Sequence, residues 1–186
     1  MTIFFIDIRG FTTISEKVEP EELLDMLNNY FSEVTKIIFD YGGTVGKFMG
    51  DGIMGFFGDP EECPDHAQKA VTMALEIQKR INKLNGEGFF WGEFPLSVGI
   101  GINTGYVTVG SIGPENHQDY TVIGRHVNLA ARLESTAKPG QILISQRTYK
   151  QVKNTIEAEK IGEIEEIGEI AVKGFEKPVK VYNVVY

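Results

Sequence analysis

The chain has 186 residues, 42% of them hydrophobic, which predicts one domain with a sizeable core. Its formal net charge of -8 at pH 7 excludes a broadly basic surface, so we expect no nucleic-acid partner. The single cysteine, Cys63, excludes an intrachain disulfide and a cysteine-based zinc site, which is typical of a reducing compartment. We therefore expect a cytoplasmic location, either free or as the cytoplasmic domain of a membrane-anchored protein.

The first half of the chain alternates strand and helix patterns. The apolar run 2–8 predicts a buried strand, and Gly10 then opens a turn into a brief helix. Pro20 marks the start of an amphipathic helix that ends at the glycines 42–43. Its apolar positions recur at spacings of three and four: Leu23, Leu24, Leu27, Phe31, Val34 and Ile38. A hairpin over 46–57 follows, with Asp51 at its tip between two glycines that we expect to take positive φ, and then a second long helix over 67–84.

The second half of the chain is richer in strand patterns. Residues 96–102 and 106–112 predict a second hairpin, with Asn103-Thr104-Gly105 as its turn. Helices are expected over 127–136 and 146–152, strands over 141–145 and within 156–186, and turns at Lys173-Gly174 and Lys177-Pro178. The order β-α-β-β-α-β with additional elements predicts an α+β fold. Its core is expected to be ferredoxin-like, a largely antiparallel sheet flanked by helices.

Two carboxylates from distant parts of the chain meet in this predicted order. The strand that ends with Asp7 would lie beside the hairpin that presents Asp51, and two such carboxylates can share divalent cations. The turn at Gly10 would also point backbone N–H groups toward an anion. Taken alone, however, Gly-Asp-Gly is also ordinary turn chemistry. The combination of a cation site with an anion site favours a nucleoside triphosphate ligand.

Three segments resemble the catalytic domain of class III nucleotidyl cyclases, and the resemblance covers essentially the whole chain. The segments are Phe5–Thr12 (FIDIRGFT), Lys47–Asp51 (KFMGD) and Tyr120–Glu134 (YTVIGRHVNLAARLE), followed by Val172-Lys173-Gly174-Phe175. The resemblance implies a single catalytic domain over residues 1–186, which we expect to belong to a longer protein with regulatory domains.

The resemblance assigns the chemistry to named positions. It implies that Asp7, Asp51 and the backbone carbonyl of Ile8 bind two Mg²⁺ or Mn²⁺ ions, which promote attack of the ribose 3′-hydroxyl on the α-phosphate. Arg132 matches the transition-state arginine and Asn128 the residue that positions the ribose. The remaining phosphate contacts are expected from the segment Gly10, Phe11 and Thr12 and from Lys173.

Lys47 and Thr121 match the positions that select the base. Lys47 can only donate, which suits N1 of adenine, and the hydroxyl of Thr121 can accept from the adenine amine, so ATP is the expected substrate. Guanylyl cyclases of the family usually have Glu and Cys at these two positions. Threonine at position 121 is similar to the subgroup that responds to bicarbonate, so bicarbonate is an expected effector.

The resemblance also implies a homodimer with two equivalent sites. Each site would take its metals from one chain and Lys47, Thr121, Asn128 and Arg132 from the other. Two alternatives stay open: a pseudoenzyme of the same fold that senses a nucleotide or binds a partner, and a guanylyl cyclase with an atypical pocket. Two positions depart from the subgroup, since many members have an arginine where His117 stands and an acid where Arg125 stands.

Overall fold

The computed structural model describes residues 1–88, 94–114, 118–159, 162–172 and 175–185. In chain order the elements are β1 (Thr2–Ile8), α1 (Phe11–Ser15), α2 (Pro20–Asp40), β2 (Thr44–Met49), β3 (Gly52–Phe57), α3 (His66–Gly86), β4 (Val98–Thr104), β5 (Thr108–Ile112), β6 (Asp119–Ile123), α4 (Arg125–Thr136), β7 (Ile142–Ser145), α5 (Gln146–Glu159), β8 (Glu163–Ile170) and β9 (Val179–Val185). Across these residues no helix is long and apolar enough to cross a membrane.

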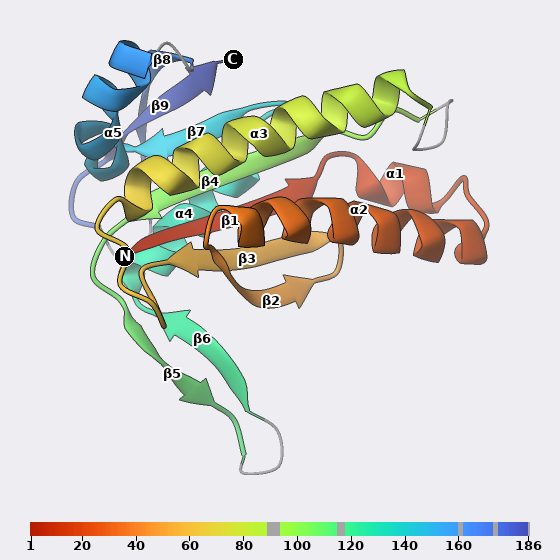
Figure 1. Cartoon of the computed structure of the whole chain (residues 1–186), viewed down its shortest axis with the longest axis horizontal. Helices are drawn as coiled ribbons and strands as arrows, with labels where there is room; N and C mark the ends of the chain where they lie inside the picture. Colours follow the sequence, from red (N-terminus) through yellow and green to blue (C-terminus); the bar gives the residue numbers. More distant parts are fainter. Residues whose placement is uncertain (89–93, 115–117, 160–161, 173–174, 186) are drawn as a thin grey trace.

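A seven-stranded sheet with the order β2-β3-β1-β4-β7-β9-β8 forms the centre of the molecule. Among the strand pairs of the described residues in this sheet, only β4–β7 is parallel. The segment β1-α2-β2-β3-α3-β4, with strand order β2-β3-β1-β4, is the predicted ferredoxin-like core. Helices α2, α3 and α5 pack on one face of the sheet and α4 packs on the other (Figure 1). The predicted α+β class is thus confirmed.

The long helices follow their apolar spacing, with one exception. The predicted helix over 67–84 is confirmed as part of α3, and its regularly spaced apolar side chains are buried, namely Ala67, Ala70, Val71, Ala74, Leu75, Ile77, Ile81 and Leu84. In α2 the prediction for Leu24 was wrong, because this side chain is 61% exposed and Met26 and Tyr30 fill the core instead. The buried face of α2 is therefore rotated relative to the predicted one. The prediction missed this because Tyr30, which carries a hydroxyl, was not counted among the apolar positions.

The predicted hairpin through Asn103-Thr104-Gly105 was wrong. Strand β4 pairs with β1 on one side and β7 on the other, so both of its edges are already occupied. Strand β5 pairs instead with β6, which the sequence analysis did not predict. The two form an arm that extends from the body of the molecule (Figure 1). On the arm Val122 is buried, and Val109 is partly buried against the same cluster, whereas Ile112, Tyr120 and Ile123 are exposed, so its strands show little of the regular apolar alternation on which such predictions depend.

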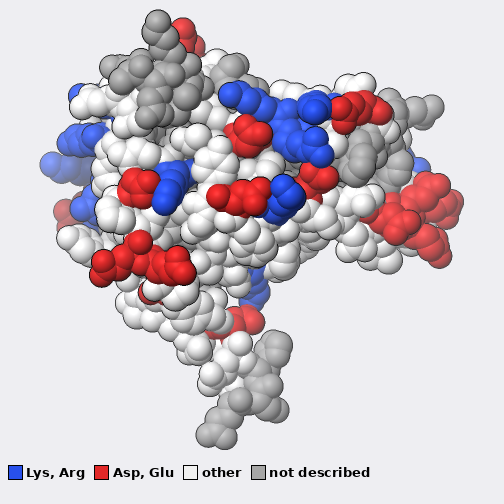
Figure 2. Space-filling model, viewed as in Figure 1, with Lys and Arg blue, Asp and Glu red and all other residues white. Residues whose placement is uncertain are grey.

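The C-terminal part also differs from expectation. Helix α5 runs to Glu159 rather than 152, so the strands expected from residue 156 begin only at Glu163. Lys177-Pro178 directly precedes β9 as expected, and the turn predicted at 173–174 lies outside the described residues. Figure 2 shows acidic and basic side chains interspersed over the face that α2 and α3 cover.

Candidate active site

Asp7 and Asp51 lie together at one end of the central sheet. Strand β1 pairs antiparallel with β3, with Ile6 opposite Ile53, so the end of β1 meets the turn between β2 and β3. Gly50 takes the predicted left-handed conformation, with φ of 63°. Gly52 does not, and its role is one of space, because a Cβ there would lie 2.9 Å from Oδ1 of Asp7. The expected meeting of the two carboxylates is confirmed.

Both carboxylates lie where a negative charge is unfavourable. Burial, followed by the charges of Asp51 and Glu134, raises the pKa of Asp7 to about 6, and the guanidinium of Arg9 only partly offsets these effects. Burial also raises the pKa of Asp51, although the backbone N–H groups of Asp51 and Ile8 oppose the shift. Two half-buried carboxylates with raised pKa values form a site in which the positive charge of Arg9 only partly balances the negative charge.

Arg9 connects the carboxylate pair to α4. Its Nη1 lies 3.0 Å from Oδ2 of Asp7, and its Nη2 donates to both the side chain and the backbone carbonyl of Glu134. The guanidinium lies against Gly99, where a Cβ would collide with it. The sequence analysis did not give Arg9 a role. Its position two residues after Asp7 is the signal that could have found it, since alternate residues of a strand share a face.

Tyr30 reaches the same region from α2, behind the sheet. It is fully buried, and its hydroxyl has no hydrogen-bond partner in the part of the chain that the structure describes. Burial raises the pKa of this phenol strongly, followed by the charges of Asp7 and Asp51, so it stays neutral at physiological pH. Tyr30, whose neutral hydroxyl lies close to the carboxylates, is therefore a second residue of the site that the sequence analysis missed.

The donor set fits divalent cations. Asp7, Asp51 and the Ile8 carbonyl offer the hard oxygen ligands that Mg²⁺ and Mn²⁺ prefer, and Mg²⁺ is commonly bound by one or two carboxylates together with substrate phosphates. No group of three or more His, Cys, Asp or Glu residues suited to a metal occurs among the described residues. The third acid nearby, Glu134, is paired with Arg9. The metals would therefore need substrate oxygens to complete their coordination.

Asn128 and Arg132 lie one turn apart on α4 and are both exposed. The opposite side of α4 is fixed against the sheet by Leu129 and Leu133, which are buried. Glu134, which contacts Arg9, is two residues after Arg132, a rotation of about 200° around the helix axis. Arg132 consequently points away from the carboxylate pair of its own chain.

Lys47 and Thr121 are brought into one neighbourhood by an ion pair. Lys47, on β2, lies 3.1 Å from Asp119 on β6, measured from Nζ to Oδ2. Thr121 follows Asp119 by two residues on the same strand, so the two side chains share a face. The two residues that were expected to contact the base are therefore neighbours within one chain. The sequence analysis missed Asp119, because its ion pair with Lys47 joins two strands that are far apart in the sequence and leaves no local pattern.

The other predicted positions have different outcomes. Gly10 caps α1 with φ of 73°, followed by Phe11 and Thr12 in the first turn of this five-residue helix. Arg125 is exposed at the start of α4, where its guanidinium lies 5.6 Å from the ring centre of Phe175. Lys173 and His117 lie outside the described residues, so the phosphate contact expected of Lys173 stays a prediction.

The comparisons with known proteins agree with this geometry. Residues 1–185 match the family model of the adenylate and guanylate cyclase catalytic domain, and the chain belongs to this family. The crystal structure of the adenylyl cyclase CyaB from P. aeruginosa is 47% identical, with a TM-score of 0.91 over 100% of this chain and 93% of that one. The crystal structure of the guanylyl cyclase Cya2 is 40% identical, with a TM-score of 0.85 over 98% and 90%.

Among curated relatives, the adenylate cyclase of Anabaena cylindrica is 36% identical over 99% of this chain. The chain spans 36% of that protein and only 8% and 27% of the adenylate cyclases from Dictyostelium discoideum and Rhizobium meliloti. The fold is thus that of a cyclase catalytic domain, which the resemblance of its motifs predicted. Adenylyl and guanylyl cyclases both occur among the similar structures, so family membership leaves the base open.

Replacing Asp7 by Asn is expected to raise the thermal stability of the metal-free protein at about pH 7.5. Because folding raises the pKa of Asp7 to about 6 from 3.8, the folded state is penalised for carrying this charge. The penalty is fully present above the folded-state pKa and disappears as the pH falls through 6 toward the unfolded value. Thermal unfolding in EDTA measures it, with Asp40→Asn, an exposed carboxylate paired with Lys36, as the control. A gain that is equally large at about pH 4 would contradict the electrostatic cause.

Proposed function

We propose that the chain is an adenylyl cyclase, which converts ATP to 3′,5′-cyclic AMP and pyrophosphate. The observation that carries the proposal is the pair Asp7 and Asp51 at one end of the sheet, with raised pKa values and oxygen donors suited to divalent cations. When bound there, two Mg²⁺ or Mn²⁺ ions would lower the pKa of the ribose 3′-hydroxyl and stabilise the departing pyrophosphate.

The protein residues then position ATP and stabilise charge. The 3′-oxygen loses its proton and forms a bond to the α-phosphorus, while the bond from this phosphorus to the bridging oxygen of the β-phosphate breaks. Arg132 would donate to the α-phosphoryl oxygens as charge develops on them, and Asn128 would orient the ribose. The backbone N–H groups at the Gly10 turn and the side chain of Lys173 would contact the remaining phosphates.

The base preference rests on the neighbourhood of Lys47 and Thr121. The ammonium of Lys47 can donate to N1 of adenine but clashes with the N1–H of guanine, and Thr121 can accept from the adenine amine. The ion pair with Asp119 supports this role, because it holds the ammonium beside the strand that carries Thr121. Bicarbonate as an effector stays a prediction from Thr121.

A homodimer with shared sites is part of the proposal. Arg132 points away from the carboxylates of its own chain, so a second chain would supply it. The arm β5–β6 supports an interface, because it extends from the body and exposes Ile112, Tyr120 and Ile123, with the 88% exposed Tyr106 at its base (Figure 1). Isolated exposed apolar side chains are normal, but their concentration on one two-stranded arm favours a partner surface.

The test is to incubate the purified protein with ATP or GTP and Mn²⁺ and to separate the products by chromatography. Cyclic AMP from ATP, in clear excess over cyclic GMP from GTP, is the expected result. Cyclic GMP as the main product would favour the guanylyl alternative, for which the likeness to Cya2 is the supporting observation. ATP binding without any cyclic product would favour the pseudoenzyme.

Replacing Asp119 by Asn is expected to raise KM for ATP by up to about fivefold, the range for losing one exposed ion pair, while kcat changes little. The reason is that Lys47 loses the carboxylate that orients it, so the preference for ATP over GTP also falls. Steady-state kinetics with both nucleotides measures the effect, against Asp40→Asn as the matched control. An unchanged ratio of kcat/KM for the two nucleotides would show that Asp119 does not act on base selection.

A further inference from the structure

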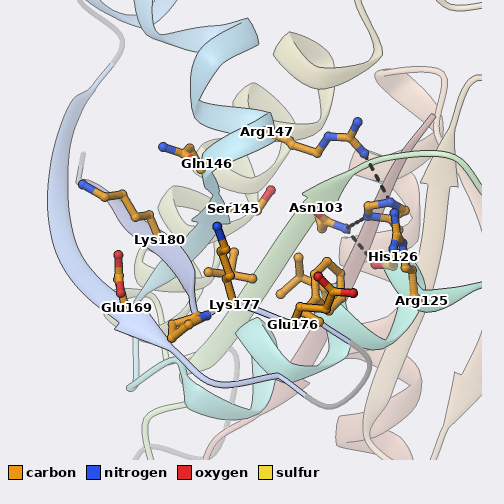
Figure 3. A pocket seen from close by; sticks show the side chains of 14 residues that line it. Asn103, Arg125, His126, Ser145, Gln146, Arg147, Glu169, Glu176, Lys177 and Lys180 are labelled. Carbon is orange, nitrogen blue, oxygen red and sulfur yellow. Dashed lines mark hydrogen bonds between the residues drawn. The ribbon is translucent and has the colours of Figure 1, made fainter.

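A second recess lies at the far end of α4, away from the carboxylate pair. It has a volume of about 660 Å³ and lies between the starts of α4 and α5, the end of β4 and the strands β8 and β9 (Figure 3). Strand β1 runs antiparallel to β4, with Thr2 opposite Thr104 and Ile8 opposite Val98. The recess, at Asn103, is therefore at the opposite end of the sheet from Asp7.

Basic side chains gather around this recess. Arg125, Arg147, Lys177 and Lys180 line it together with the two acids Glu169 and Glu176, so its lining carries a formal charge of four minus two, or +2. The whole chain carries -8. Lys180 is paired with Glu166, whereas Arg125, Arg147 and Lys177 form no ion pair with any described residue. Three cations that face one recess without a carboxylate partner attract an anion.

The start of α4 also favours an anion at this recess. Gly124 at its N-cap offers no side-chain hydrogen bond, so the first N–H groups of this twelve-residue helix are not capped by that residue. Arg147 donates to Nε2 of the buried His126 at 3.2 Å, as the dashed line in Figure 3 shows. Burial lowers the pKa of His126, and the charges of Arg147 and Arg125 lower it further, so the ring stays neutral. A neutral ring that accepts from Arg147 at Nε2 carries its proton on Nδ1, so the amide nitrogen of Asn103, 3.3 Å from Nδ1, donates to the His126 carbonyl instead.

A buried acceptor at the recess lacks a donor. Asn103 lines the recess and is 0% exposed, and its amide nitrogen donates to the backbone carbonyl of His126 at 2.8 Å. Its oxygen, Oδ1, has no partner within the described part of the chain. A buried unpaired acceptor is costly, and a ligand that brings a hydroxyl or an amine would satisfy it.

We infer that this recess binds a small phosphate monoester that also carries a hydroxyl or amine group. The phosphate would contact the start of α4 with Arg125, Arg147 and Lys177, and the hydroxyl or amine would donate to Oδ1 of Asn103. Arg125 is one of the three cations at this site that have no carboxylate partner among the described residues, and the acid that many members of the resembling subgroup have at this position would repel a phosphate. The inference concerns a second site and does not depend on the cyclase activity.

Titration calorimetry of the full chain in EDTA, without nucleotide, tests the inference. The probes are glycerol 3-phosphate, methyl phosphate and inorganic phosphate. Glycerol 3-phosphate is expected to bind once per chain and more tightly than methyl phosphate, which lacks the hydroxyl. Arg125→Asp is expected to weaken binding by roughly tenfold to a hundredfold, the range for losing a charge-assisted hydrogen bond. Lys177→Gln, at an exposed position, gives a second variant that leaves the fold intact.

Arg132→Ala and Asp51→Asn serve as matched controls at the proposed nucleotide site, and both are expected to bind glycerol 3-phosphate as the unmodified chain does. Loss of binding in these two variants, with binding retained in Arg125→Asp and Lys177→Gln, would move the phosphate to the nucleotide site and overturn the inference. Absence of binding by the unmodified chain would overturn it too. Equal affinity for glycerol 3-phosphate and methyl phosphate would overturn the role of Asn103.

Discussion

Replacing Arg132 by Ala is expected to lower kcat for cyclic AMP formation by about 10² to 10³, the cost of removing one donor that stabilises transition-state charge. KM for ATP should change much less, because the guanidinium acts on charge that develops only as the bond to the α-phosphorus forms. Steady-state kinetics with ATP and Mn²⁺ measures both constants. Arg132→Lys should recover only part of the activity, since an ammonium lacks the planar fork of donors.

Arg80→Ala is the matched control for this prediction. Arg80 is also a partly exposed arginine on a helix, but it pairs with Glu33 at 2.8 Å between α3 and α2, on the opposite face of the sheet from α4. Its loss should leave kcat unchanged. If Arg132→Ala instead raised KM with kcat intact, Arg132 would bind the ground state of ATP and would not be the transition-state residue.

The carboxylate pair was predictable from sequence because strand order alone determines it. A strand that ends in Asp7 and a hairpin with Asp51 at its tip must meet once the β-α-β-β order places them side by side. The environment of the pair was not predictable. Arg9 follows β1, whereas Glu134 lies on α4 and Tyr30 on α2, and their contacts depend on how α4 and α2 lie on the sheet. Packing of this kind leaves no periodic pattern in a sequence.

The pairing of β5 with β6 could not be predicted from the sequence. Residues 103–105 looked like a hairpin turn, yet β4 is a central strand whose two edges are filled by β1 and β7. Turn residues report local backbone preference, whereas strand pairing is decided by which edges remain free. The same limit explains Asp119. Its partner Lys47 is 72 residues earlier in the chain, and only the approach of the arm to β2 joins them.

Asp51→Asn is expected to abolish detectable cyclase activity, because an amide cannot replace the negative charge that divalent cations require at this position. The sharper expectation concerns a mixture of this variant with Arg132→Ala. In a mixed dimer one site combines both defects, while the other takes its carboxylates from the Arg132→Ala chain and its arginine from the Asp51→Asn chain. Random exchange makes half of the dimers mixed, each with one intact site of two, so about a quarter of the unmodified activity should return.

A mixture of Asp51→Asn with Asp7→Asn is the control for shared sites. Both defects lie in the carboxylate pair, so every site of every dimer keeps one of them, and no activity should return at any ratio of the two chains. Recovery in the first mixture but not in the second would require that carboxylates and arginine come from different chains. Absence of activity in both mixtures, with exchange of chains verified by mass-labelled protein, would mean that each chain builds its own site. Arg132 would then have to turn back across α4 to reach Asp7 of the same chain.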